Sequence, residues 1–180
     1  MCQFLIENHH NDNPANDFGI TPLHVASEKG HLQVCKLILE PLIDKDSKFE
    51  HPRNLFGDTP THFSAQNGHF EACKLLIENT IDKNPKNNNG TTPLHFSAYH
   101  GHLNICKLFI NYVTLKNPPD NHGVTPLHEA ARKGHFEICK LLINDINEKN
   151  PETFNGETVI HFARFKGYDD ICKLIIESQK

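Results

Sequence analysis

The feature that most constrains the fold of this chain is an internal repeat, which runs along nearly all of its 180 residues. Aligning the sequence on five threonines, Thr21, Thr59, Thr92, Thr125 and Thr158, gives steps of 38, 33, 33 and 33 residues. All ten glycines then fall into two columns of the alignment, and all six cysteines fall into one. A repeat of this length indicates stacked units that bury their apolar surfaces against their neighbours.

Each unit predicts two short helices and a turn. Thr21-Pro22 is typical of a helix start, because the hydroxyl caps free N–H groups and proline suits the first helical position. We expect the first helix to run to about Lys29 and to end at Gly30 in a left-handed cap. The second helix, over residues 31–40, is apolar on most sides, so neighbouring units must cover it.

A six-residue motif starts the units, most clearly as Thr21-Pro22-Leu23-His24-Val25-Ala26 and Thr125-Pro126-Leu127-His128-Glu129-Ala130. Together with the period and the Gly-His pair that follows, this motif resembles the ankyrin repeat family. The resemblance implies an all-α solenoid of stacked helix–turn–helix units with hairpin-like finger loops. It divides a single domain, residues 1–180, into a partial repeat (1–14), repeat 1 with an extended loop (15–52), repeat 2 (53–85), repeat 3 (86–118), repeat 4 (119–151) and repeat 5 (152–180).

Two departures from the family pattern concern the connections between units. Repeat 1 carries five extra residues within residues 44–50, which predict a longer loop. We also expect the second helix to end in an unusual way, because other residues replace the usual glycine there: Leu42, Thr80, Val113 and Asp145. Neither end of the chain carries a polar capping face, which leaves open a piece of a longer array or a self-contained protein with imperfect caps.

The cysteines are predicted to be core residues. One position of the second helix holds a cysteine in every unit: Cys2, Cys35, Cys73, Cys106, Cys139 and Cys172. Equivalent helices of neighbouring units pack about 8–10 Å apart, whereas a disulfide needs Cα atoms within about 7 Å. The sequence also lacks the Cys-x-x-Cys pattern of a zinc site. We therefore expect buried free thiols and a reducing, intracellular compartment, cytoplasmic or nuclear.

Nine of the fourteen histidines also fall into repeat columns. The resemblance implies that those of the motif bond to its threonine and to neighbouring backbone: His24, His62, His95, His128 and His161. Four others follow the helix-ending glycine: His31, His69, His102 and His135. The remaining five are His9, His10, His51, His100 and His122. His9-His10 near Asp12 could ligate a metal, but adjacent histidines in a polar turn are more often solvated, so we predict no metal site.

Composition and pattern argue against several function classes. A net charge of −4 lacks the clustered lysines and arginines of a nucleic-acid binder. No run of 18 apolar residues predicts a membrane span. Every glycine belongs to a repeat column, which leaves no phosphate-cradling loop, and no catalytic group breaks the repeat symmetry. We therefore predict no enzymatic activity, no cofactor and no small-molecule substrate, and a monomer or part of a longer chain.

The resemblance extends to one modification. Asn84, Asn117 and Asn150 resemble the asparagines that hydroxylases modify in ankyrin fingers. Lys83 and Pro85 flank the first of these where valine and a small residue are usual, so the match is incomplete.

The columns that vary between units predict the function. By resemblance, a protein partner or peptide contacts the finger tips and the exposed face of the first helix, which together form a concave surface. Aromatic residues and arginine are the usual anchors of such interfaces. The candidates are Phe18, Ile20, Phe56, Asp58, Tyr99, His100, His122, Arg132, Lys133, Phe154 and Phe165.

Three alternatives remain open from the sequence. The finger-tip aromatics could instead pack on the neighbouring finger. Arg132, Lys133 and Lys166 could draw an acidic segment, although acidic side chains prevent a continuous basic stripe. The array could also be a structural spacer, or a regulatory module that acts within a larger protein.

Overall fold

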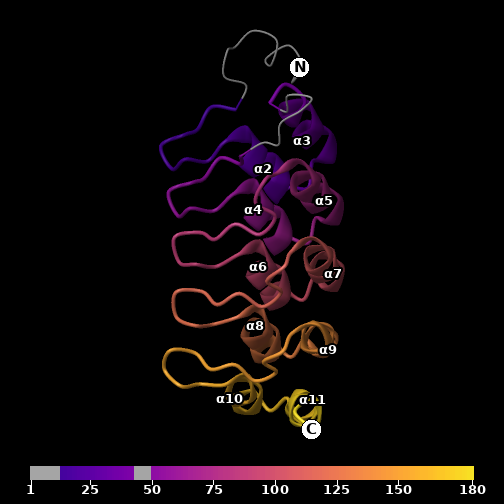
Figure 1. Ribbon diagram of the computed structural model, residues 1–180. Coiled ribbons are helices and arrows are strands. Elements are labelled where there is room, and N and C mark those ends of the chain that lie inside the picture. The colour runs from indigo at the N-terminus through magenta and orange to yellow at the C-terminus, as the bar shows by residue number, and fades with distance from the viewer. Residues whose placement is uncertain (1–12, 43–49) are drawn as a thin grey trace.

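A computed structural model describes residues 13–42 and 50–180 of the chain. Its described helices form five consecutive pairs: α2 (Pro22–Glu28) with α3 (Leu32–Leu39), α4 (Pro60–Gln66) with α5 (Phe70–Asn79), α6 (Pro93–His100) with α7 (Leu103–Tyr112), α8 (Pro126–Lys133) with α9 (Phe136–Asp145), and α10 (Val159–Phe165) with α11 (Asp169–Ser178). Figure 1 shows three columns, made of the finger loops, the first helices and the second helices. Each helix contacts its partner and the equivalent helices of adjacent pairs. The predicted all-α solenoid is confirmed.

Several predictions lie outside the described residues. They concern the partial repeat with Cys2, the group His9-His10-Asp12, and nearly all of the extension within residues 44–50. The boundaries of the repeats stay predictions.

Each first helix begins at the motif threonine through a reciprocal pair of hydrogen bonds. In α2, the backbone N–H of His24 donates to Thr21 Oγ1 (3.4 Å), and the backbone N–H of Thr21 donates to His24 Nδ1 (3.1 Å). The same arrangement begins α4, α6, α8 and α10. The imidazole replaces the glutamate of the usual capping box, which explains why histidine follows threonine by three residues.

The other ring nitrogen of this histidine joins one unit to the next. Because Nδ1 accepts a hydrogen bond, Nε2 carries the proton and donates it to a carbonyl of the following finger. The Nε2–O distances are 3.0 Å for His24–Asp58, 3.2 Å for His62–Thr91 and 3.1 Å for His95–Val124. These three units confirm the hydrogen bonds that the resemblance implies.

The glycine after each first helix permits both a left-handed turn and a close contact. Gly30 has φ of 68°, a region that chiefly glycine adopts. A Cβ on Gly30 would lie 2.5 Å from Nδ1 of His69 in the next unit. Nε2 of His69 in turn lies 2.9 Å from the carbonyl oxygen of Glu28. The second histidine column therefore packs on the glycine column of the preceding unit.

The second helices end without a glycine, and lysines take over part of its role. Thr80 and Val113 cap α5 and α7 in extended conformations. Lys83 Nζ donates to the carbonyl oxygens of Ile77 and Thr80, the latter at 2.6 Å. The ammonium thus satisfies carbonyls that the end of α5 leaves free, and its charge suits the negative end of the helix dipole.

The equivalent lysines of the next two units differ from each other. Lys149 Nζ donates to the carbonyl oxygens of Ile143 and Ile146 at the end of α9, which includes Asp145 as its last residue. Lys116 Nζ instead forms an ion pair with Asp145 across units, at 2.7 Å. The sequence predicts an unusual helix end, and the structure supplies its chemistry.

The cysteine column lies in the core. The described cysteines are buried and unpaired: Cys35, Cys73, Cys106, Cys139 and Cys172. They pack with leucine, isoleucine and alanine side chains in a small cluster at the N-terminal end of the stack and a larger cluster over the other units. The prediction of core thiols is confirmed for these five.

Candidate functional site

Each finger loop is held in shape by a polar side chain at its base. Asn54 Oδ1 accepts hydrogen bonds from the backbone N–H groups of Phe56 and Asp58, both at 2.9 Å. The same position closes the neighbouring fingers through Asn16, Asn87 and Asp120. The finger tips are therefore presented on defined loops.

Neighbouring fingers are joined through their backbones. The N–H of Leu55 donates to the carbonyl of Phe18, and the N–H of Asn88 donates to that of Phe56, both at 3.0 Å. The side chains of Phe18 and Phe56 stay exposed, at 64% and 67%. Both residues therefore leave most of their surface open to solvent.

The imidazole rings of three motif histidines contact phenylalanine rings on the first helix of the following unit. Three phenylalanines stand edge-on against histidines of the preceding unit, with ring centres 5.4, 5.8 and 5.1 Å apart: Phe63 on His24, Phe96 on His62 and Phe162 on His128. Such contacts contribute about 0.5–1.5 kcal/mol beyond area burial. Glu129 occupies the same position in the fourth unit and interrupts the series.

Glu129 belongs to a charged cluster beside this interruption. Its carboxylate accepts a hydrogen bond from Arg132, whose guanidinium carbon lies 5.1 Å from the ring centre of Tyr99. Lys133 Nζ lies 4.2 Å from the same ring centre. Burial raises the pKa of Glu129, and the Arg132 charge opposes that rise. Arg132 is therefore already paired with a carboxylate, whereas Lys133 is exposed on an aromatic face.

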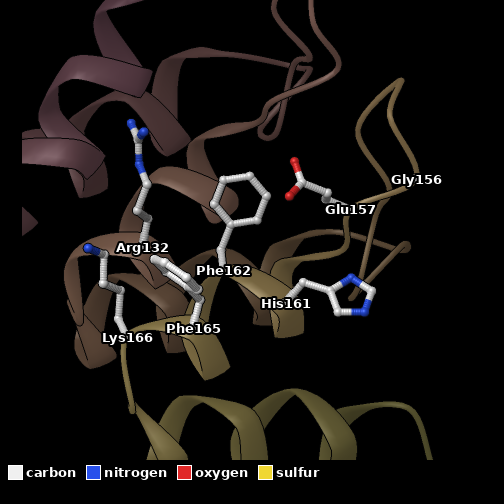
Figure 2. Close-up of a pocket in the computed structure, with 7 residues that line it drawn as sticks. All are labelled: Arg132, Gly156, Glu157, His161, Phe162, Phe165 and Lys166. Atoms are coloured by element: carbon white, nitrogen blue, oxygen red, sulfur yellow. The ribbon is translucent and has the colours of Figure 1, made fainter.

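A groove of about 690 Å³, here called the α8–α10 groove, lies next to this cluster. It is lined by Arg132, Gly156, Glu157, His161, Phe162, Phe165 and Lys166. In Figure 2, Arg132 and Lys166 lie on one side of the two phenylalanine rings, and Glu157 and His161 lie on the other. Phe165 is 85% exposed, and Lys166 Nζ lies 5.3 Å from its ring centre. The groove thus combines an exposed aromatic floor with a cationic edge.

Family models of the ankyrin repeat match this architecture along the chain. A model of a single ankyrin repeat matches residues 18–47, and a model of three ankyrin repeats matches residues 41–120, 79–150 and 112–180. The chain belongs to the ankyrin repeat family. No curated protein matches it. Ankyrin repeats are in general protein–protein interaction modules, and ankyrin repeat proteins are in general non-catalytic.

The ankyrin fold divides the eleven candidate residues by exposure. Seven are exposed: Phe18, Phe56, His100, His122, Lys133, Phe154 and Phe165. Four are half-buried: Ile20, Asp58, Tyr99 and Arg132. Asp58 illustrates the second group, because its carboxylate accepts a hydrogen bond from Asn87 Nδ2 at 2.8 Å and thereby links two fingers.

The structure brings some candidates together and separates others. Arg132 and Phe165 share the α8–α10 groove. Phe154 lines a different groove, of about 480 Å³, with residues that connect second helices to fingers, such as Leu115 and Ile146. The sequence prediction also missed Phe162, which lines the first groove. Its position in the repeat varies between valine, phenylalanine and glutamate, and that variation was the available signal.

An asparagine ahead of four of the five described fingers holds the start of the first helix. Asn84 Oδ1 accepts a hydrogen bond from the backbone N–H of Leu94 at 3.1 Å. The same bond is made in other ankyrin repeats by Asn13, Asn117 and Asn150. In repeat 2, His51 takes this place, with Nδ1 3.0 Å from Thr61 Oγ1. His51 is therefore a scaffold residue, while hydroxylation of the asparagines stays a prediction.

Burial sets the ionisation of the motif histidines. It lowers the pKa of His62 to about 3 and the pKa values of His95 and His128 to about 4. These rings are therefore neutral near pH 7. Among the described residues, no group of three or more histidine, cysteine and acidic side chains is placed to hold a metal ion. None of the described helices combines the length and apolar character needed to cross a bilayer.

Proposed function

We propose that this ankyrin array is a non-catalytic module that binds a segment of another protein on its finger–helix surface. This surface consists of the finger tips and the exposed faces of α2, α4, α6, α8 and α10. The observation that carries the proposal is the α8–α10 groove, in which Phe165 leaves 85% of its surface in water. Exposed apolar surface rimmed by polar groups is typical of interaction sites.

The surface is ordered before any partner arrives. Asn54 and its equivalents close the fingers, and backbone hydrogen bonds such as Asn88 to Phe56 join them. Ordering loops at an interface costs free energy that a preformed surface does not lose on binding. The partner can therefore be a short flexible segment and still bind with useful affinity.

A protein segment suits this surface better than the other partner classes. Glu157 and Lys166 line the same groove, and the chain carries a net charge of −4. This mixture opposes a uniform polyanion such as nucleic acid, which needs a continuous cationic footprint. The proposal involves no cofactor and no small-molecule substrate.

We also propose that the protein works in a reducing intracellular compartment, the cytoplasm. Burial raises the pKa values of Cys73, Cys106 and Cys139 to about 12, so these thiols stay protonated and unreactive while the chain is folded. Folding in an oxidising compartment would expose the same thiols to pairing. Protein purified from cells with thiols blocked at lysis should carry all six cysteines reduced. Disulfides in that preparation would contradict the location.

The binding proposal is tested by selecting a displayed library of random twelve-residue peptides against the whole 180-residue chain. Selected peptides are then measured against Phe165→Ala and against Tyr112→Ala. Tyr112 is a matched control, because it is an exposed aromatic residue on α7, in the second-helix column.

We expect peptides whose binding weakens about tenfold with Phe165→Ala, the loss of about 1–2 kcal/mol usual for an interface anchor. The same peptides should bind Tyr112→Ala as they bind the original protein. Peptides that never depend on Phe165 or on the finger tips would overturn the proposal and favour a structural spacer.

A further inference from the structure

We propose that the array carries a second binding surface, which takes a segment of a protein partner that combines basic and apolar side chains. The surface, here called the connection groove, is the space of about 480 Å³ whose lining includes Leu115, Lys116, Ile146, Glu148, Glu152 and Phe154. The inference goes beyond the proposed function, because among the described residues none lines both this groove and the α8–α10 groove.

The connection groove exposes apolar side chains from two consecutive repeats. Leu115, in the connection that follows α7, leaves 62% of its surface in water. Phe154, in the finger that precedes α10, leaves 75% of its surface in water. Covering such apolar surface is favourable, because the water that contacts it is released.

The ring of Phe154 is held in place by the preceding finger. The backbone N–H of Phe154 donates to the carbonyl of His122 at 3.0 Å. A Cβ on Gly123 would lie 2.9 Å from Cδ1 of Phe154, so the ring lies against the backbone of this glycine. The ring is therefore positioned before a partner arrives, while most of its surface stays open.

Two carboxylates line the same groove without a cationic partner. Glu148 and Glu152 are both exposed. Glu148 Oε1 accepts a hydrogen bond from the backbone N–H of Asn150 at 3.2 Å. The ion pairs of 4 Å or less within the described residues join other side chains, and their cations are Lys29, Lys116 and Arg132.

The lysines close to these carboxylates in the sequence and in the groove are engaged elsewhere. Lys116 lines the groove and pairs with Asp145 at 2.7 Å. Lys149 donates to carbonyl oxygens at the end of α9 and does not belong to the lining. The two glutamates therefore leave negative charge beside exposed apolar side chains, and a basic side chain of a partner is its electrostatic complement.

An arginine next to apolar residues satisfies both properties of the groove. A guanidinium group pairs with carboxylates through parallel hydrogen bonds, and it also stacks on aromatic rings such as that of Phe154. A neighbouring leucine can cover Leu115. The partner class is thus a protein segment in which arginine and aliphatic residues lie close together.

The test uses three fluorescein-labelled peptides and the full 180-residue chain. The probe has four Gly-Leu-Arg units. One control has four Gly-Leu-Gln units, which keep the apolar side chains but lack the charge. The other control has four Gly-Ser-Arg units, which keep the charge but lack the apolar side chains. Binding is followed by fluorescence anisotropy at low and at physiological salt.

We expect the Gly-Leu-Arg peptide to bind about tenfold more tightly than either control, because only the probe combines exposed ion pairs with apolar contact. Its advantage over the Gly-Leu-Gln peptide should shrink as salt screens the charges. Glu148→Gln with Glu152→Gln should abolish this advantage. Both substitutions keep a side-chain oxygen, so the hydrogen bond from Asn150 can persist.

A matched control separates the groove from the overall charge of the chain. Glu71→Gln with Glu177→Gln removes the same charge from exposed residues outside the groove, and it should leave the advantage of the Gly-Leu-Arg peptide unchanged. An equal loss in both double variants would show that the peptide follows net charge alone, and it would overturn the inference.

The apolar half of the groove is tested with phenylalanine variants. Phe154→Ala should weaken binding of the Gly-Leu-Arg peptide about fivefold. Phe18→Ala removes an exposed phenylalanine from another finger and should change nothing. Binding that is lost with Phe165→Ala and kept with Phe154→Ala would place the peptide in the α8–α10 groove, overturning this inference and leaving the proposed function standing. Undetectable binding at low salt would also overturn it, while the library selection decides the proposed function separately.

Discussion

One position on the first helices, eight residues after the motif threonine, differs between the two ends of the array. The first two repeats carry Lys29 and Asn67 there, and the last three carry His100, Lys133 and Lys166. At the N-terminal end both polar groups have partners within their own repeat. Lys29 pairs with Glu28, and the Asn67 amide donates to the carbonyl of its own helix at 2.9 Å.

In repeats 4 and 5 the residue at the same position is a lysine whose ammonium group lies near an aromatic ring. Lys133 and Lys166 contact aromatic rings and no carboxylate among the described residues. Around both sets of residues the capping boxes, the left-handed glycines and the buried cysteines are the same. The comparison shows that the residues shared by all repeats build the same scaffold at both ends, while the contacts at this variable position differ.

The prediction with the largest expected effect tests whether the N-terminal and C-terminal repeats unfold together as one unit. Burial gives His62, His95 and His128 folded pKa values of about 3 to 4, below the value of 6.5 of the unfolded chain. The unfolded state therefore binds more protons below pH 6.5, so the stability contribution is complete above that pH and is lost as pH falls toward 4. Lowering the pH from 7 to 5 should reduce the free energy of unfolding by about 2 kcal/mol for each of these rings.

Urea unfolding at the two pH values measures this loss, and two probes compare the ends. Circular dichroism reports on all helices, whereas the three tyrosines, Tyr99, Tyr112 and Tyr168, lie only in the C-terminal repeats. The two transitions should coincide at both pH values. Equal midpoints at pH 5 and pH 7 would contradict the buried neutral rings, and separate transitions would contradict the shared scaffold.

Substituting two matched glycines distinguishes the loss of stability caused by contacts between repeats from the loss caused by backbone strain. Gly134 and Gly167 both have φ of 77°. A Cβ on Gly134 would lie 2.6 Å from the ring of Tyr168, whereas nothing lies within 4 Å of one on Gly167. Gly167→Ala should cost about 1 kcal/mol and Gly134→Ala about 3 kcal/mol. Equal losses in urea unfolding would show that the glycine column serves the turn alone.

Substitutions of the lysines that follow the second helices test which members of this column stabilise the fold. Lys149 bonds to carbonyls at the end of α9, and Lys116 pairs with Asp145 near the surface. Lys149→Met should lower the unfolding free energy by about 1–2 kcal/mol, because it leaves carbonyls unsatisfied. Lys116→Met should lower it by less than about 0.5 kcal/mol. Thermal unfolding of both variants checks the order, and a reversed order would rule out the capping role of Lys149.

The smallest expected effect concerns Lys133 and Lys166. Lys133→Ala with Lys166→Ala should change the unfolding free energy by less than about 0.5 kcal/mol, because both side chains are exposed. Urea unfolding beside Lys29→Ala provides the comparison. A loss above about 1 kcal/mol would mean that these cations support the fold and are not free for a partner.

Periodicity predicted most of the scaffold correctly. Helix starts at Thr21 and its equivalents, glycine turns and the five described core cysteines all recur every 33 residues or nearly so. A contact that recurs in every repeat places the same type of residue at the same position of each repeat, and the sequence shows this without a structure. The Lys83 cap left such a column too, but its role depends on where the chain turns after α5.

The candidate surface was predicted less completely. The sequence named Arg132 as a candidate interface anchor, and the structure adds that its guanidinium bonds to Glu129. It grouped Phe154 with Phe165, although they line different grooves. These contacts join side chains that occur once in the chain, so no repetition in the sequence indicates them.

The sequence by itself determined the ankyrin architecture, because identical local interactions in each unit impose one helix–turn–helix geometry and one way of stacking. Tertiary structure alone decided which variable side chains meet. Arg132 and Lys133 both lie near the ring of Tyr99, but only Arg132 also forms an ion pair with Glu129. Short-range geometry between adjacent repeats therefore decides which charges remain for a partner, and composition cannot reveal it.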